Sequence, residues 1–331
     1  MQPGKRSRAS APGKVIVCGE HAVVYGHPAI ALPVASVRAS ATVEAAAGDG
    51  IVCFAPNLGE TWRLAQQCDH PLAQLIVATL ERIGVPTDVS LRVTLLSDIP
   101  IASGMGSGAA LGAALVRALA AFCGHPLGDA EVAALVYEGE RAYHGTPSGI
   151  DNTVVSYEQP IWFVRGTNNA PPIIEPLRIR TPFSLVIGDT GVRAPTYITV
   201  GGVRERWQRN AQHFNARFAQ IGAVADAARA ALANGQIEQL GRLFDQNQAL
   251  LEEIGVSSPE LDHLIDAARA AGALGAKLSG GGGGGIMIAV ATAETAPTIQ
   301  AALHAAGAVR VLHTTVSAVA KSMVMKLLSQ A

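Results

Sequence analysis

Residues 91–121 read LRVTLLSDIPIASGMGSGAALGAALVRALAA. The first part is apolar, which predicts a β-strand that ends near Ser97. The last part is rich in Ala and Leu and carries no charge except Arg117, so it predicts a helix that is buried on nearly every side. Between them lie Gly104, Gly106 and Gly108, which allow close approach to the main chain. Because the first amides of a helix carry partial positive charge, this stretch favours a phosphate-binding loop.

The same glycines also fit a dinucleotide-binding fingerprint. Residues 104–109 match G-x-G-x-x-A, and acids follow about 20 residues later at Asp129 and Glu131. That motif places its first glycine directly after the strand, whereas residues 97–103 intervene here. The chain also lacks a GxxxxGK[ST] sequence, which argues against an ordinary P-loop NTPase. An NAD-dependent oxidoreductase and a plain glycine turn therefore stay open as alternatives to a phosphate-binding loop.

The composition limits the class of protein. The chain has 331 residues, of which 49% are hydrophobic and 15% charged, and its net charge is −1. This length leaves room for two domains, which we expect at 1–182 and 183–331. Since no long basic or acidic run occurs, nothing favours nucleic acid or a membrane surface as partner, and no apolar run is long enough to span a bilayer. The four cysteines are scattered without a CxxC pair, as is typical of reduced thiols in a cytoplasmic protein.

Hydrophobic periodicity predicts the other elements. Strands are expected at 15–18, 29–34, 37–45, 183–188, 286–290 and 309–316, and helices at 71–83, 128–143 and 293–306. A helical pattern also extends from 196 to 271, with breaks expected near Gly222, Gly235 and Gly255. The segment GTPSGIDN at 145–152 predicts a turn that presents Asp151 ahead of an apolar strand.

Two further segments are candidates for a site. Lys14, Glu20 and His21 stand at the edges of very apolar segments, and three such groups within eight residues favour a functional role. Six glycines at 280–285 separate two short apolar strands. Because strands hold both ends, we expect a turn that can lie under a ligand, and not a flexible linker.

Three segments together resemble the GHMP kinase superfamily and, within it, the mevalonate kinases. They are APGKVIVCGEHAVVYGHPAI at 11–30, IPIASGMGSGAA at 99–110 and KLSGGGGGGIMIAV at 277–290. The turn GERAYHGTPSGIDN at 139–152 and the segment DTGVRAPTYITVGGVRER at 189–206 are also similar to stretches of these enzymes. The order and spacing of the segments cover almost the whole chain, which is far more specific than any one of them.

The resemblance implies an α+β fold of two domains, the N-terminal one similar to domain 2 of ribosomal protein S5 and the C-terminal one ferredoxin-like. It implies transfer of the γ-phosphate of ATP, with Mg²⁺, to the terminal hydroxyl of mevalonate, giving 5-phosphomevalonate for isopentenyl diphosphate synthesis. It also implies a cytoplasmic enzyme that is often a homodimer. Other GHMP kinases, which act on phosphomevalonate, homoserine or a sugar, and a non-catalytic ligand-binding relative stay open.

The resemblance also implies roles for individual residues. Asp151 matches the catalytic base, and Lys14 matches the cation beside it, which stabilises an emerging alkoxide. Glu140 matches the magnesium carboxylate, with Ser107 as a further metal ligand. The acceptor substrate is expected at Glu20, His21 and Thr196. The residues expected to cradle ATP are Pro100, Ser103, Gly104, Met105, Gly106, Ser107, Gly108, Ala109, Gly282 and Gly283.

One position departs from the family pattern. The usual sequence GLGSSAA has a second serine that helps to hold magnesium, and Gly108 stands in its place here. We expect weaker metal binding as a result, with Glu140, phosphate oxygens and water holding the ion, or with Ser107 shifting to do so.

Overall fold

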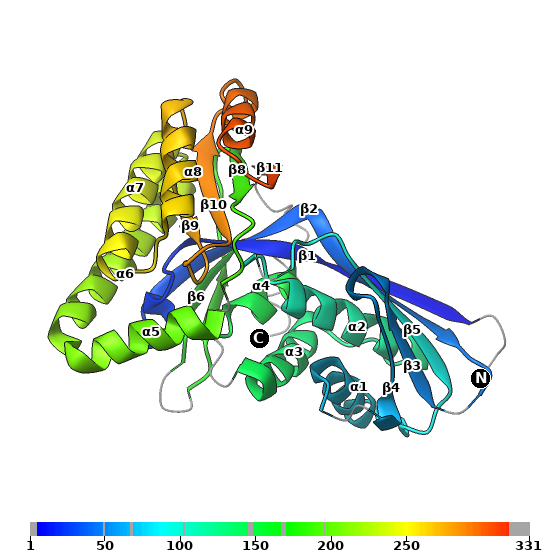
Figure 1. Cartoon of the computed structure of the whole chain (residues 1–331). Helices are drawn as coiled ribbons and strands as arrows, with labels where there is room; N and C mark the ends of the chain where they lie inside the picture. The colour runs from blue at the N-terminus through cyan, green and yellow to red at the C-terminus, as the bar shows by residue number, and fades with distance from the viewer. Residues whose placement is uncertain are drawn as a thin grey trace. The chain divides into compact units, whose positions relative to one another are not determined.

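The computed structural model describes residues 5–48, 50–66, 69–101, 103–144, 148–166, 170–194 and 196–317. The chain divides into two compact units, whose elements are labelled in Figure 1. Unit 1 contains the chain up to Lys14, Pro33–Pro100 and Gly106–Glu158, and unit 2 contains Val15–Leu32, Ile101–Met105 and the chain from Gln159 onward. Both units mix helices and strands, which confirms the expected α+β class. The domain boundary expected after residue 182 stays a prediction.

Unit 1 contains a sheet whose strand order is β4-β3-β5-β2, with β1 paired to β2. The strands are β1 (Arg6–Cys18), β2 (Pro28–Ala45), β3 (Ile51–Ala55), β4 (Glu60–Arg63) and β5 (Leu91–Ser97), of which β1 and β2 also contribute residues to unit 2. Strand β5 ends at Ser97, as predicted. The two strands expected at 29–34 and 37–45 are one continuous strand, because the exposed residues 35 and 36 interrupt the hydrophobic alternation without interrupting the extended backbone.

Four helices of unit 1 pack against one another. They are α1 (Pro71–Arg82), α2 (Ser107–Cys123), α3 (Asp129–His144) and α4 (Ile150–Tyr157). Short 3₁₀ turns lie at η2 (Pro56–Leu58) and η3 (Leu64–Gln66), and η1 (Ala22–Tyr25) belongs to unit 2. The strand expected directly after Asp151 is wrong, because these residues form α4. Gly149 adopts a left-handed φ of 87° ahead of the helix, and Val154 and Val155 are buried in helical form, so tertiary packing overrides their β preference.

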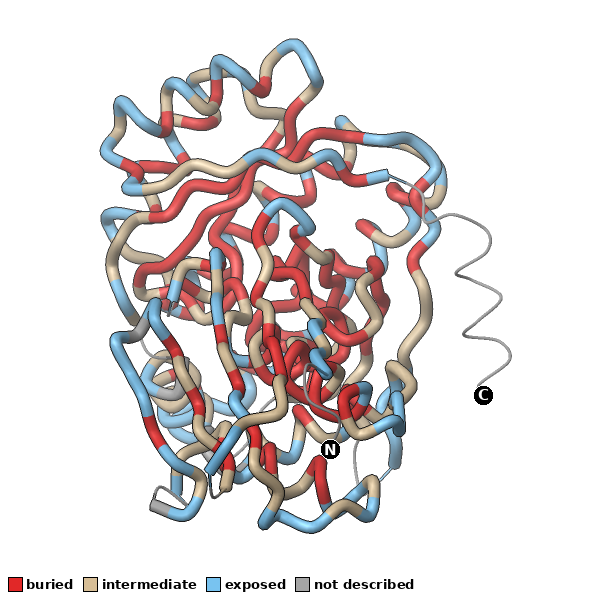
Figure 2. The backbone as a smooth tube through the Cα atoms, turned by 90° about the vertical axis from the view of Figure 1, so that its right-hand side faces the viewer, coloured by how far each residue is buried: buried red, intermediate tan, exposed pale blue. Residues whose placement is uncertain are grey.

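Unit 2 contains an antiparallel sheet with the order β11-β8-β10-β9. These strands are β8 (Phe183–Asp189), β9 (Gly275–Ser279), β10 (Ile286–Ala291) and β11 (Arg310–Val316). The start of β2 pairs with β6 (Ile161–Val164), which pairs with β7 (Ile173–Pro176). The helices are α5 (Thr196–Arg209), α6 (Ala211–Asn234), α7 (Ile237–Glu253), α8 (Pro259–Ala270) and α9 (Ala296–Ala305), and α7, α8 and α9 pack on the sheet. Figure 2 shows buried residues following the inner strands and the inward helix faces.

Two of the three expected helix breaks are confirmed. Gly235 ends α6 with a φ of 75°, and Gly255, with a φ of 72°, follows α7. The break near Gly222 is wrong, because α6 continues through it. A Cβ at Gly222 would lie 3.0 Å from Nδ1 of His27. This glycine therefore permits close packing of the helix and does not end it.

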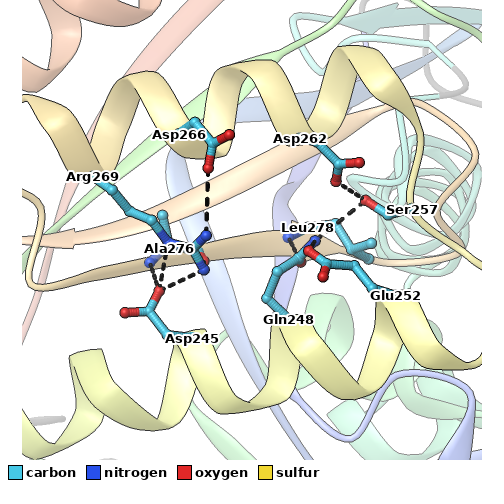
Figure 3. A network of polar contacts seen from close by, with 9 residues as sticks. All are labelled: Asp245, Gln248, Glu252, Ser257, Asp262, Asp266, Arg269, Ala276 and Leu278. Carbon is cyan, nitrogen blue, oxygen red and sulfur yellow. Dashed lines mark hydrogen bonds and ion pairs between the residues drawn. The ribbon is translucent and has the colours of Figure 1, made fainter.

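Side chains of α7 cover the outer edge of β9 (Figure 3). Oδ1 of Asp245 accepts hydrogen bonds from the Ala276 amide at 3.1 Å and from Nε of Arg269 at 2.8 Å. The buried Gln248 accepts from the Leu278 amide at 2.9 Å. An uncovered edge strand exposes unpaired amides, so these acceptors fix β9 and the glycine run that follows it.

The described cysteines Cys18, Cys53 and Cys123 are free thiols, as predicted, and Cys68 lies outside the described residues. Burial raises the pKa of both Cys18 and Cys53 to about 12, which makes these thiols poor nucleophiles. Within the described ranges, no helix is both long and apolar enough to cross a membrane.

Candidate active site

An ion pair between Lys14 and Asp151 forms the centre of the candidate site in unit 1. Lys14 is in β1, and its Nζ lies 2.9 Å from Oδ1 of Asp151, in the first turn of α4. The lysine side chain is only 3% exposed, whereas that of the aspartate is 30% exposed. A buried ammonium therefore holds a carboxylate that a second molecule can still reach. The start of α4 also favours this carboxylate, because the positive end of the helix dipole lies there.

Glu140 of α3 contributes a second carboxylate to the same place. Burial, and to a smaller extent the negative charge of Asp151, raise the pKa of Glu140 to about 8 against the opposing effect of Lys14. One ammonium thus faces two carboxyl groups, and a further positive charge nearby would favour the ionised form of Glu140. This convergence removes the main argument for a non-catalytic relative, which would leave Lys14, Glu140 and Asp151 apart.

The glycine loop enters α2 beside Lys14. Gly106 precedes the helix in a left-handed conformation with a φ of 71°, and a Cβ there would lie 2.9 Å from Cγ of Lys14. The first helical hydrogen bond runs from the Ala110 amide to the Gly106 carbonyl at 2.9 Å, and no side chain caps the helix. The amides of Ser107, Gly108 and Ala109 therefore precede the helical hydrogen-bond ladder and suit an anion.

The other predicted loop residues of this segment belong to unit 2, except Pro100, which follows β5 in unit 1. Ser103 and Met105 are buried, and Gly104 has a left-handed φ of 86°. A Cβ at Gly285 would lie 2.7 Å from the Ser103 carbonyl, so the loop and the glycine run are in contact.

The glycine run is a structured turn between β9 and β10, as expected. A Cβ at Gly282 would lie 1.9 Å from the Val256 carbonyl, and the Gly283 amide donates to the same carbonyl at 2.8 Å. The Gly285 amide donates to the Val192 carbonyl at 2.9 Å. Only glycine permits this packing, so the run is held in place by its neighbours in unit 2.

His21 contacts the same glycine run from the turn after β1. Nε2 of His21 lies 3.0 Å from the Gly281 carbonyl, to which it donates as a neutral imidazole. Burial, with a smaller contribution from the charge of Arg206, lowers the pKa of His21 to about 4 against the opposing effect of the hydrogen bond to Gly281. His21 also has a left-handed φ of 59°, which is uncommon for a residue other than glycine.

Glu20 is enclosed by partners that the sequence did not reveal. One carboxylate oxygen of Glu20 pairs with Nζ of Lys277 in β9, and the other accepts from Nδ2 of Asn247 in α7 at 3.0 Å. Both side chains of the ion pair are 0% exposed. The only sequence signal for this pair was a lone lysine in an apolar strand, which needs a counter-charge when it is buried.

The remaining predicted site residue is Thr196, the first residue of α5. Its side chain lies outside the described part of the chain, so its contacts stay a prediction.

Family models match most of the described helices of both units. Residues 71–159 match the GHMP kinases N-terminal domain, and residues 228–309 match the GHMP kinases C-terminal domain. The first match contains Glu140, Asp151 and the glycine loop, and the second contains the glycine run.

Several relatives and solved structures to which the chain is similar are mevalonate kinases. The chain is 32% identical to a mevalonate kinase of Pyrococcus furiosus and 33% identical to one of Aeropyrum pernix, each over 86% of this chain and 88% of the relative. A solved structure of L. major mevalonate kinase in complex with R-mevalonate is 30% identical, with a TM-score of 0.83 over 96% of this chain and 99% of that one.

Proposed function

Because the chain belongs to the GHMP kinases and, within them, to the mevalonate kinases, we propose that it transfers the γ-phosphoryl group of ATP to the terminal hydroxyl of mevalonate. The product is 5-phosphomevalonate, an intermediate of isopentenyl diphosphate synthesis. The single observation that carries the proposal is the convergence of Lys14, Glu140 and Asp151 beside the start of α2.

Asp151 and Lys14 act on the acceptor hydroxyl. The reachable carboxylate of Asp151 orients this hydroxyl and accepts its proton as the oxygen attacks phosphorus. Lys14 lies 2.9 Å from Asp151, so its ammonium also stabilises negative charge that develops on the attacking oxygen. The new oxygen–phosphorus bond forms as the bond to the ADP oxygen breaks, and the proton goes to Asp151.

The loop before α2 binds the phosphates of ATP. The amides of Ser107, Gly108 and Ala109 precede the helical ladder and donate to phosphate oxygens. The helix behind them is buried and apolar, and this surrounding strengthens the attraction between its positive end and an anion. The contributions of Pro100, Ser103, Gly104, Met105, Gly282 and Gly283 to this cradle are part of the same proposal.

Magnesium fits the carboxylates of this group. Burial and the charge of Asp151 raise the pKa of Glu140 to about 8, so a cation there stabilises the ionised form. The described residues contain no cluster of three or more His, Cys, Asp and Glu side chains that could hold a metal. Glu140, with Ser107, would therefore hold the ion together with phosphate oxygens and water. When bound, Mg²⁺ neutralises phosphate charge during transfer.

Glu20, His21 and Thr196 belong to the acceptor side of the proposal. The carboxylate of Glu20 is already occupied by Lys277 and Asn247, so it acts by holding the turn that carries His21. A cytoplasmic location and a homodimer, which are common in this family, remain predictions for this chain.

One coupled assay tests the proposal. The protein is mixed with ATP, Mg²⁺ and either mevalonate, phosphomevalonate, homoserine or galactose, and ADP release is followed. Mevalonate alone should drive release. Asp151→Asn should abolish it and keep nucleotide binding, because the substitution removes the proton acceptor and leaves the loop before α2 intact. ADP release with another acceptor would assign the chain another GHMP kinase activity. Binding of a nicotinamide cofactor would favour the oxidoreductase alternative.

A further inference from the structure

Arg117 is the one charge within α2, a helix that is otherwise apolar and largely buried. Its side chain is 18% exposed. One guanidinium nitrogen, Nη2, lies 2.8 Å from Oδ1 of Asp129, the first residue of α3, and the same nitrogen donates to the carbonyl of Ser156 in the last turn of α4. The other, Nη1, donates to Oε1 of Glu158 at 3.1 Å. One side chain therefore connects three helices.

Glu158 extends the contacts to the strands of unit 1. It follows α4 in a left-handed conformation with a φ of 53°, and its Oε2 accepts from Nη2 of Arg38 in β2 at 2.8 Å. Nε of Arg38 donates to the hydroxyl of Ser10 in β1 at 2.9 Å. We call Ser10, Arg38, Arg117, Asp129, Ser156 and Glu158 the Arg117 network.

The Arg117 network touches every element of unit 1 that carries a candidate catalytic group. Strand β1 carries Lys14, α3 carries Glu140, α4 carries Asp151, and α2 begins at the phosphate-binding loop. Arg117 lies ten residues along α2 from Ser107, which is about 15 Å at 1.5 Å per residue. The network thus connects the helices far from the reacting groups.

Because of the directions of the helices, the Arg117 network holds the ends of α2, α3 and α4 that lie away from the candidate catalytic groups. At the chemical end lie the start of α2, the end of α3 and the start of α4, whereas Arg117 contacts the later part of α2, the start of α3 and the end of α4. The three helices also pack against one another. A rigid helix transmits a displacement at one end to the other, so the network sets how far each helix extends toward the site.

We propose that Arg117 is a positioning residue that aligns Lys14, Glu140, Asp151 and the phosphate-binding loop for phosphoryl transfer. The proposal rests on the proposed kinase function. Arginine suits the role, because its planar fork holds several oxygens in a fixed geometry, which the single ammonium of a lysine does not.

A matched pair of variants tests the proposal. Arg117→Met removes the hydrogen bonds from α2 to Asp129, Ser156 and Glu158. The control is Arg82→Met, which removes an ion pair from α1 to Glu131 in the first turn of α3. Both arginines contact the same end of α3, but α1 carries none of the candidate catalytic groups. Arg117→Met should lower kcat with mevalonate about tenfold or more, about 1.4 kcal/mol of barrier. Its KM for ATP should change by less than about threefold, and the control should keep both constants within about twofold.

A second variant keeps the test decisive if Arg117→Met folds poorly. Glu158→Gln removes the carboxylate that Arg38 and Arg117 share and retains the size of the side chain. It should lower kcat as well, and the double variant with Arg117→Met should lose less than the product of the two separate effects, because both break one network. Independent losses in the double variant, or a folded Arg117→Met protein with kcat within about twofold of the wild type, would overturn the proposal.

Hydrogen exchange separates this proposal from the kinase assignment, since it needs no turnover. In Arg117→Met, exchange should speed up at the Ala110 amide, which makes the first helical hydrogen bond of α2 and lies seven residues from Arg117. Faster exchange confined to the turns that touch Arg117 would overturn the positioning role. A wild-type protein that releases no ADP with mevalonate would overturn the function and leave this comparison valid.

Discussion

Gly106→Ala should disturb the Lys14–Asp151 pair, although it replaces neither of the two side chains. Gly106 has a φ of 71°, and alanine in that left-handed region costs about 1–2 kcal/mol of stability. The new Cβ would lie 2.9 Å from Cγ and 3.1 Å from Cε of Lys14, whereas ordinary contacts begin at 3.4 Å. Because Lys14 is only 3% exposed, its stem has little room to retreat, and Nζ must move relative to Asp151. Misplacement by a fraction of an ångström should lower kcat by about tenfold or more.

The control for backbone strain is Gly124→Ala at the opposite end of α2. Gly124 has a φ of 86°, and a Cβ there meets nothing within 4 Å. Both variants should therefore lose about 1–2 kcal/mol in urea unfolding, but only Gly106→Ala should lose kcat in the ADP-release assay. Equal kcat in the two variants, at equal loss of stability, would refute the claim that Gly106 sets the position of Lys14.

Three further predictions follow from the buried polar groups and from the departure at Gly108. The folded state keeps the pKa of His21 at about 4, below its ordinary value, so between pH 6.5 and pH 4 the unfolded chain takes up a proton that the folded chain does not. Stability should thus fall by about 2 kcal/mol from pH 7 to pH 5, and urea unfolding of His21→Asn should show a smaller fall. Lys277→Met should cost about 3–5 kcal/mol in the same measurement, because it leaves the fully buried Glu20 without its cation; adding Glu20→Gln should restore part of that loss. Gly108→Ser meets open space and should lower the Mg²⁺ concentration that gives half-maximal turnover; an unchanged Mg²⁺ dependence would show that the glycine does not weaken metal binding.

Local pattern predicted most of the fold because most elements depend on their own periodicity. The strand ending at Ser97 and the apolar helix after it were predicted from one stretch of sequence. The exceptions were decided by tertiary contacts. Val154 and Val155 favour a strand locally, yet they are buried in α4, and Gly222 suggests a break, yet it makes room for His27.

Less of the candidate site could be predicted from local sequence patterns. Lys14, Glu140 and Asp151 lie far apart along the chain, and their meeting was predicted only from the resemblance to a family. Lys277 and Asn247 were missed altogether. Lys277 had a local signal, since a lone charge in an apolar strand requires a counter-charge, but nothing nearby in the sequence identified Glu20 as its partner.

The exposure of the paired carboxylate distinguishes a buried lysine that takes part in the reaction from one that stabilises the fold. Lys14 and Lys277 both lie in buried strands, and both pair with a carboxylate. Glu20 is 0% exposed, so the pair that it forms with Lys277 is buried within the fold and orients the turn around it. Asp151 is 30% exposed, so its pair with Lys14 can accept a proton from an incoming hydroxyl. Phosphoryl transfer needs a carboxylate that the acceptor can reach, and on this criterion the open pair is the reacting one.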